Sequence, residues 1–258
     1  MKKRTGNEIS VKGFGQTEMS AQKGFTLVEL SIVLVIIGLI IGGVLKGQEL
    51  IGNAQIKNVV SQAQAYQAAT VAFRDKYGSL PGDVVGPNNI IPNCTAAPCS
   101  PGGAGLGDGL VGATANANYT TDVSAAAENV AFWQQLAVTR FIGDIELGTT
   151  STAIFGSRFP SAATGGGFQV LYQNTTGRHV LRLAGTVATP SNANGALRPD
   201  QALQIDRVID DGQPVTGSVF TNTNLSDGAG TNACITVATN IYTSANSNRT
   251  CNLVIDIN

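Results

Sequence analysis

The feature that most constrains this chain is a long apolar run at residues 25–45. A transmembrane helix requires about 20 consecutive, mostly apolar residues, and this run supplies them. It contains one charged residue, Glu29, close to its start. A carboxylate in an apolar environment is costly unless it is paired, so it needs a specific partner. The run therefore predicts a membrane-spanning helix with an unusual acid near one end.

The charge distribution predicts the orientation of that helix. Residues 1–24 contain five basic and two acidic side chains, a net charge of +3. Residues 25–258 contain 11 basic and 15 acidic side chains, a net charge of −4. Basic residues next to a transmembrane segment favour the cytoplasmic side, so the short N-terminal arm should stay inside and the remainder should be exported. The acidic balance of the exported part argues against a dedicated nucleic-acid site.

An ordinary cleavable signal peptide is the alternative for this region. Its apolar core would span about 7–15 residues and end in a small-residue cleavage site. The present run is longer, and Leu45 is followed by Lys46, Gly47, Gln48 and Glu49. We therefore reject the signal-peptide interpretation.

The residues at the start of the run carry a family resemblance. The segment KGFTLVEL, residues 23–30, resembles the N-terminal signature of type IV prepilins and type II secretion pseudopilins. The resemblance implies that a prepilin peptidase, which also methylates the new N-terminus, cuts the Gly24–Phe25 bond and methylates Phe25. It also implies that Glu29 compensates the N-terminal amine of a neighbouring subunit in a filament. The alternative is that Glu29 is an interfacial residue whose carboxylate reaches the lipid headgroups.

The resemblance extends weakly beyond the run, and the chain departs from the family pattern at one point. FRDKYGSLPGD (73–83), FWQQLA (132–137), FIGD (141–144) and IDRVIDDGQPVTGSV (205–219) are similar to the globular domains of such proteins. Many pilins have a proline that kinks the helix beyond the membrane, but no proline occurs between Phe25 and Leu80. Gly38, Gly42, Gly43 and Gly47 are instead the candidate weak points, since glycine costs about 1 kcal/mol relative to alanine in a helix.

The pattern after the run predicts a continuous helix from about Thr26 to Tyr77. Apolar and aromatic residues recur at spacings of three and four between Ile56 and Tyr77, which is typical of one helical face. Gly78 and Pro81 should end the helix. We expect four parts: a cleaved basic leader (1–24), a transmembrane and assembly helix (25–45), an amphipathic helix (46–78) and an exported globular head (79–258).

The head has the sequence pattern of an α+β, pilin-like domain in which the long helix packs on an antiparallel sheet. Residues 82–124 predict a long Gly-rich loop, and residues 125–142 a helix capped by Ser124, stopped by Gly143 and anchored in the core by Trp133. Residues 168–172 and 179–187 predict strands joined by a turn at 174–177, and residues 199–209 a short helix. Residues 215–221, 235–239 and 253–257 could complete the sheet.

All four cysteines follow the membrane segment, where an oxidising compartment favours disulfides. Proximity in sequence favours Cys94–Cys99 and Cys234–Cys251. The second would close a loop of about 16 residues, worth about 3 kcal/mol in the loop-entropy model. A metal site and reduced, buried cysteines are the alternatives that we rank lower.

No catalytic constellation is present, and we expect no enzymatic activity and no cofactor. His179 is the only histidine and is interpreted as structural. Asp206, Asp210 and Asp211, and separately Asp108, could contribute oxygens to Ca²⁺, which takes 6–8 of them. The alternative for these aspartates is hydrogen bonding at a helix end and in turns.

The residues and the resemblance together predict a structural subunit of a type IV pilus or a type II secretion pseudopilus. A helix that is apolar on all sides must be buried in lipid or among other copies of itself. The implied partners are the prepilin peptidase, other pilins and an inner-membrane assembly platform. The implied location is the inner membrane before assembly, and a periplasmic or surface filament afterwards. The alternative function is a filament-tip adhesin or a substrate-binding minor pilin.

Overall fold

The computed structural model describes residues 24–102, 105–112, 127–143, 145–147, 154–174, 177–187, 195–221, 234–236 and 238–257. The predicted leader, residues 1–24, lies outside this part of the chain except for Gly24. The chain divides into two units, residues 1–49 and residues 50–258. The second unit is called the head below.

The long helix predicted from the sequence is present as α1, Leu27–Tyr77. It is continuous through Gly38, Gly42, Gly43 and Gly47, so these positions do not break it. Gly78 ends it as predicted: this residue takes a φ of 74°, and its N–H donates to the Arg74 carbonyl at 2.8 Å. A left-handed residue that closes onto the preceding turn is a common helix C-cap.

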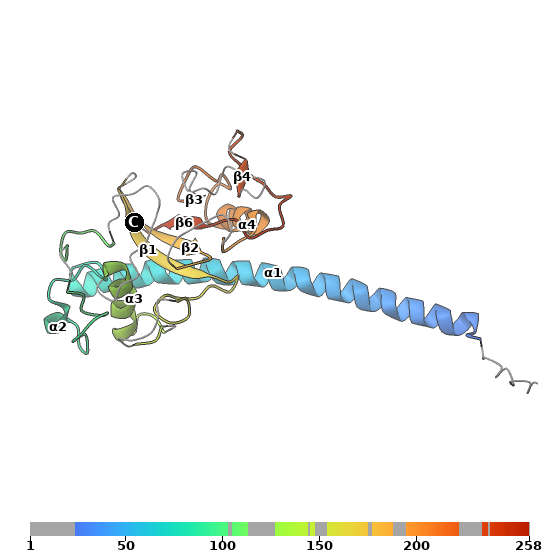
Figure 1. Ribbon diagram of the computed structural model, residues 1–258, viewed down its shortest axis with the longest axis horizontal. Coiled ribbons are helices and arrows are strands. Elements are labelled where there is room, and N and C mark those ends of the chain that lie inside the picture. The colour runs from blue at the N-terminus through green and yellow to red at the C-terminus, as the bar shows by residue number, and fades with distance from the viewer. Residues whose placement is uncertain are drawn as a thin grey trace, which may run out of the picture. The chain divides into compact units, whose positions relative to one another are not determined.

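The part of α1 that belongs to the head buries one face. Its buried side chains recur at helical spacing: Ile56, Val59, Val60, Ala63, Tyr66, Ala69, Thr70 and Phe73. Tyr66 packs edge-to-face against Trp133 and Phe168, with ring centroids 5.0 and 5.2 Å apart. Phe168 belongs to β1 (Gly167–Gln173), which lies beside this part of α1 in Figure 1. Trp133 belongs to α3 (Glu128–Val138). The aromatic contacts therefore connect the helix, the sheet and α3 in one core.

The head contains a four-stranded antiparallel sheet in the order β1-β2-β6-β3. The strands are β1 (Gly167–Gln173), β2 (Arg178–Ala184), β3 (Val219–Thr221) and β6 (Leu253–Asp256). Leu181 and Leu183 face the main core, whereas Val180 joins a small cluster with Leu171 and Val254 on the other face. This α+β layout, a long N-terminal helix with an antiparallel sheet, matches a pilin-like fold. The predicted turn between β1 and β2 includes residues 175–176, which are outside the described part.

One strand prediction was wrong. Within the described part of the segment predicted as residues 235–239, Ile235 and Thr236 do not join the main sheet. They form β4 (Ile235–Thr236), which among the described residues pairs with β5 (Ile241–Tyr242) in a separate antiparallel hairpin. The hairpin is closed by a hydrogen bond from the Thr243 N–H to the Cys234 carbonyl at 3.0 Å. Its β5 strand contacts α4 (Pro199–Ile209), which has the bounds predicted from the sequence.

Helix α3 (Glu128–Val138) is shorter than the predicted 125–142. It ends before Gly143 because Arg140 takes a φ of 63°, which is incompatible with a right-handed helix. Ser124, the predicted cap, is outside the described residues. Trp133 is fully buried, as predicted. The predicted loop at 82–124 contains a one-turn helix, α2 (Pro87–Ile90), and its residues 103–104 and 113–124 are not described.

A buried glutamine fastens the start of this loop to α3. The Gln135 Oε1 atom accepts the Gly82 N–H at 2.6 Å, and its Nε2 donates to the Cys99 carbonyl at 3.0 Å. Gly82 takes a φ of 88°, and an added Cβ would lie 2.4 Å from the Glu128 carbonyl oxygen. Only glycine fits such a close backbone contact at that φ. The loop is therefore held by this polar contact as well as by apolar packing, because Val84, Ile91 and Val111 lie in the main core.

Candidate functional site

The first turn of α1 contains a pair of reciprocal hydrogen bonds. The Thr26 hydroxyl accepts the Glu29 N–H at 3.2 Å, while the Glu29 carboxylate accepts the Thr26 N–H at 2.9 Å. The same carboxylate oxygen also accepts the Thr26 hydroxyl at 2.8 Å. This arrangement is a capping box, which satisfies two backbone donors that the helix leaves without an intrahelical partner. Glu29 therefore has a partner within its own chain.

The sequence interpretation missed the role of Thr26. The signal was present, because a threonine followed three residues later by a glutamate, just before an apolar run, is typical of a helix start. On the sequence alone, the Glu29 carboxylate is assigned only to a neighbouring subunit or to the lipid interface. The structure shows that its carboxylate also stabilises the beginning of α1.

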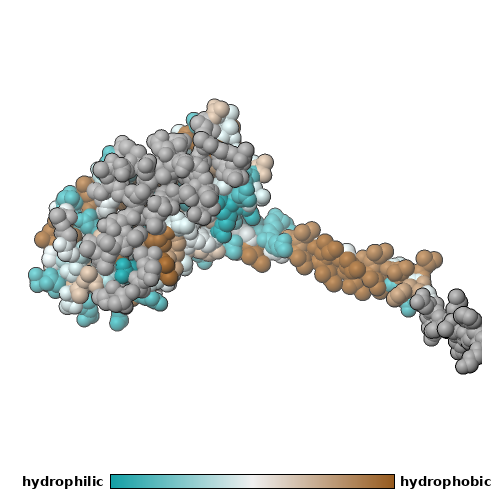
Figure 2. All heavy atoms as spheres, in the orientation of Figure 1, coloured by the Kyte–Doolittle hydropathy of each residue, from teal (hydrophilic) through white to brown (hydrophobic). Residues whose placement is uncertain are grey.

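The segment that follows has an almost uniformly apolar surface. Figure 2 shows the exposed part of α1 as a nearly continuous apolar band that is bordered by polar residues. Its exposed large side chains include Leu34, Leu39 and Val35, which are 69, 73 and 63% exposed. The helix is long and apolar enough to cross a membrane, and this stretch is not buried within the protein. The charged residues that follow, Lys46 and Glu49, form an ion pair at 2.7 Å.

The four cysteines form two disulfides in the structure, Cys94–Cys99 and Cys234–Cys251. This is the pairing that proximity in sequence favours. Cys251 also exchanges two backbone hydrogen bonds with Leu197, at 3.0 and 3.1 Å. The C-terminal end of the Cys234–Cys251 loop is thus fixed both by a covalent bond and by the backbone.

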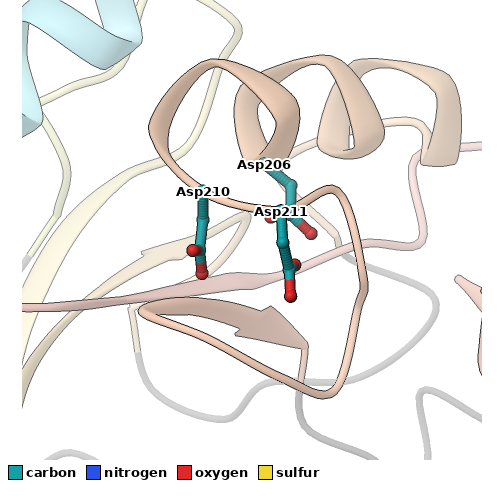
Figure 3. Close-up of side chains that lie close together, drawn as sticks. All are labelled: Asp206, Asp210 and Asp211. Carbon is teal, nitrogen blue, oxygen red and sulfur yellow. The ribbon is translucent and has the colours of Figure 1, made fainter.

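The three aspartates considered as calcium ligands come together at the end of α4. Figure 3 shows Asp206, Asp210 and Asp211 with their carboxyl groups on the same side of the helix end. Asp206 accepts the Gly212 N–H at 3.2 Å and the Tyr242 hydroxyl at 2.8 Å. Burial of Asp206, reinforced by the two neighbouring carboxylates, raises its pKa to about 6.

The other two aspartates also accept hydrogen bonds from the protein. Asp210 accepts the N–H groups of Ser218 and Val219 at the start of β3. Asp211 accepts the Gln213 N–H and the Thr216 hydroxyl, both at 2.8 Å, and these bonds lower its pKa. The cluster thus has the helix-end and turn role that the sequence also predicted. Calcium binding stays a prediction, which a Ca²⁺ titration of the melting temperature would test.

Asp108, the other calcium candidate, lies in a Gly-rich loop held mainly by ionisable side chains. Its carboxylate accepts the Leu110 N–H at 2.8 Å. Asp83 accepts the N–H groups of Gly107 and Gly109 at 2.5 and 3.0 Å, and burial raises its pKa. Glu128 accepts the Gly112 N–H at 3.0 Å, and burial also raises its pKa. The loop is therefore an anchored connection, in agreement with its interpretation as a loop.

His179 has the structural role predicted for it. Its Nε2 accepts the Val111 N–H at 3.2 Å, and its ring lies 5.0 Å from that of Tyr172. A cavity of about 280 Å³ lies beside it, lined also by Thr70, Arg74 and Ile257. A second cavity of about 230 Å³ lies beside the Cys94–Cys99 loop. Both are smaller than the roughly 300–1,000 Å³ of typical small-molecule sites.

Comparison with known proteins gives one match, at the N-terminus. Residues 19–45 match the family model of the prokaryotic N-terminal methylation motif. No curated protein and no solved structure matches the chain significantly. The matched region contains both the capping box and the exposed apolar segment of α1. It points to a structural, pilin-type protein and, with the apolar helix, supports a membrane-anchored precursor. The chain thus carries the type IV prepilin and pseudopilin signature.

Proposed function

We propose that this chain is the precursor of a filament subunit, either of a type IV pilus or of a type II secretion pseudopilus. The observation that carries the proposal is the methylation motif at residues 19–45, which coincides with an apolar helix that the chain itself leaves exposed. The prepilin peptidase cleaves the Gly24–Phe25 bond and the amine of Phe25 is methylated. The leader is residues 1–24, and residues 25–45 form the assembly helix.

Assembly removes the apolar surface of the helix from lipid and buries it among other subunits. In that environment the ammonium of Phe25 needs a compensating carboxylate, because an isolated buried charge is strongly destabilising. Glu29 of a neighbouring subunit supplies it, which requires that Glu29 exchange part of its bonding to Thr26 for a bond to the amine. The amphipathic segment 46–78 and the globular part 79–258 then lie outside the cytoplasmic membrane, in the periplasm or on the cell surface.

Replacement of Glu29 by valine tests this mechanism. Because the change removes a charge from the apolar run, we expect membrane insertion and cleavage after Gly24 to persist. Incorporation into filaments should fall below detection, since the amine would be buried without its partner at a cost of several kcal/mol. The measurements are the mass of the mature N-terminus in the membrane fraction and the amount of subunit in sheared filaments.

Glu49→Val is the matched control, because it makes the same substitution in the same helix but beyond the apolar run. It breaks the ion pair with Lys46, whose two side chains are exposed. Such pairs contribute about 0–1 kcal/mol, so filaments should form normally. Wild-type incorporation of Glu29→Val would show that Glu29 is only an interfacial residue. An unprocessed wild-type chain would contradict the proposal as a whole.

The number of copies per filament distinguishes a building block from a tip protein. A major pilin or major pseudopilin should be present along the whole filament, whereas an adhesin or substrate-binding minor pilin should be confined to a few copies. Quantitative mass spectrometry of purified filaments measures this ratio directly.

A further inference from the structure

The start of α1 lies just beyond the bond that the proposed function assigns to the peptidase. The helix begins at Leu27, and its first backbone hydrogen bond joins the Leu30 N–H to the Thr26 carbonyl at 3.2 Å. Among the described residues, no backbone N–H donates to the carbonyl of Gly24 or of Phe25. A Cβ added to Gly24 would meet no atom within 4 Å beyond its chain neighbours, and Phe25 is exposed. The Gly24–Phe25 bond therefore lies outside the helix and is unobstructed.

The Thr26 hydroxyl ends the helix at this point by taking one of its backbone donors. In an α-helix each N–H donates to the carbonyl four residues earlier, so a longer helix would bond the Glu29 N–H to the Phe25 carbonyl. It would likewise bond the Val28 N–H to the Gly24 carbonyl. The Glu29 N–H instead donates to the Thr26 Oγ1 atom at 3.2 Å. The hydroxyl thus competes directly with extension of α1 toward the Gly24–Phe25 bond.

A position outside the helix favours hydrolysis of this bond. Cleavage consumes one water molecule, which adds to the carbonyl carbon of Gly24. The C–N bond to Phe25 then breaks, and the departing nitrogen takes a proton to become the new N-terminal amine. A carbonyl oxygen without a helical hydrogen bond is free to accept donors that stabilise the negative charge of the intermediate. Inside a helix the same oxygen would already be occupied.

We propose that Thr26 is a positioning residue for processing, because its hydroxyl ends α1 before the scissile bond and so keeps Gly24–Phe25 in the form that the peptidase binds. The identity of the bond rests on the proposed function, whereas the hydrogen bonds of Thr26 do not depend on it. The methylation motif at residues 19–45 includes this threonine. Glu29→Val retains the backbone N–H that Thr26 accepts, so it should still be cleaved. The two members of the capping box therefore have different roles, Thr26 in cleavage and Glu29 in assembly.

Cleavage of the full-length chain in detergent by purified prepilin peptidase tests the role of Thr26. In Thr26→Ala the Glu29 N–H is shared between water and the Phe25 carbonyl, so chains with a longer helix accumulate. Since only chains with a free bond bind, KM should rise by about 2- to 30-fold, the factor that corresponds to the usual loss of an N-cap, with kcat unchanged. Mass spectrometry of the products gives both constants, and an unchanged KM would overturn the proposal.

Two further variants separate positioning from direct recognition of the hydroxyl by the peptidase. Glycine is nearly as good an N-cap as threonine, whereas alanine is a poor one, although both lack a hydroxyl. Thr26→Gly should therefore keep a KM close to that of the wild type, as should Thr26→Ser. If Thr26→Gly and Thr26→Ala raised KM equally, the peptidase would recognise the hydroxyl itself and the positioning role would be wrong.

Ser31→Ala is the matched control within the same helix. The Ser31 hydroxyl donates to the Val28 carbonyl at 2.8 Å and caps nothing, so its loss should leave KM unchanged. A raised KM in Ser31→Ala would show that any lost hydroxyl near the start of α1 impairs cleavage, which would overturn the assignment to Thr26.

A measurement without the peptidase tests the position of the helix start directly. The Cα chemical shift of Phe25, recorded by NMR on the full-length chain in detergent, should move toward helical values in Thr26→Ala but not in Thr26→Gly. An unmoved shift in Thr26→Ala would overturn the proposal. A wild-type chain that is not cleaved at Gly24–Phe25 would contradict the proposed function itself. Wild-type cleavage with the same KM in every Thr26 variant would contradict the positioning role alone.

Discussion

The two parts of helix α1 differ in what stabilises them. Up to Glu49 the helix exposes apolar side chains on all sides and has no tertiary contacts that bury them. From Leu50 onward the same helix buries a single face against the sheet and α3. Tertiary packing of an amphipathic face usually provides most of the stability of a helix in water. The first part lacks that packing, and under the proposed function lipid and then other subunits stabilise it.

The polar residues of the two parts also differ, because those at the start of α1 are exposed whereas those that hold the head together are buried. In the first part, the capping box formed by Thr26 and Glu29 is exposed, so its groups remain available for exchange with a partner. In the head, Gln135 and Asp206 are fully buried, and their hydrogen bonds fasten loops to helices. An acid near the start of an exposed helix is thus suited to assembly, and buried polar groups are suited to defining one head conformation.

The largest expected difference in head stability is between a core substitution and a surface substitution in α1. Phe73 is fully buried and packs against Tyr77 and Phe141, with ring centroids 4.5 and 6.2 Å apart. Phe73→Ala should reduce the free energy of unfolding of the head by about 3–5 kcal/mol. Leu39→Ala, at a side chain that is 73% exposed, should leave head stability unchanged. Thermal unfolding in detergent measures both, and a comparable loss in Leu39→Ala would contradict the independence of the two parts.

A smaller effect is expected from the Cys234–Cys251 disulfide. The two cysteines are 17 residues apart, and closure of such a loop contributes about 3 kcal/mol in the loop-entropy model. The double substitution to alanine should lower head stability by about this amount, without altering insertion of the apolar helix. The Cys94–Cys99 pair closes a much shorter loop and should contribute less. Equal losses for the two double variants would show that loop length does not determine their contributions.

The predictive value of the sequence differed between regions for physical reasons. Periodicity gave the bounds of α1 and α4 because both combine a regular apolar pattern with clear end signals, Gly78 for α1 and Pro199 for α4. It placed Ile235 and Thr236 in the wrong sheet, since a short alternating run does not specify its partner strand. The capping role of Thr26 was detectable but overlooked. The burial of Asp206 against Tyr242 was not detectable, because it depends on the packing of a hairpin 36 residues away.

The smallest effect should come from the capping box at the start of α1. Thr26→Val keeps the shape of the side chain but removes the hydroxyl that accepts the Glu29 N–H. Loss of an N-cap costs about 0.5–2 kcal/mol, and here the cost should be confined to the first turn. Hydrogen exchange should show faster exchange of the Glu29 amide, with no change in the melting temperature of the head. Thr70→Val is the matched control, because the Thr70 hydroxyl donates to the Tyr66 carbonyl in the buried part of the same helix. It should alter the head and leave the first turn unchanged, and if both variants affected both regions, α1 would transmit stability between the two parts of the chain.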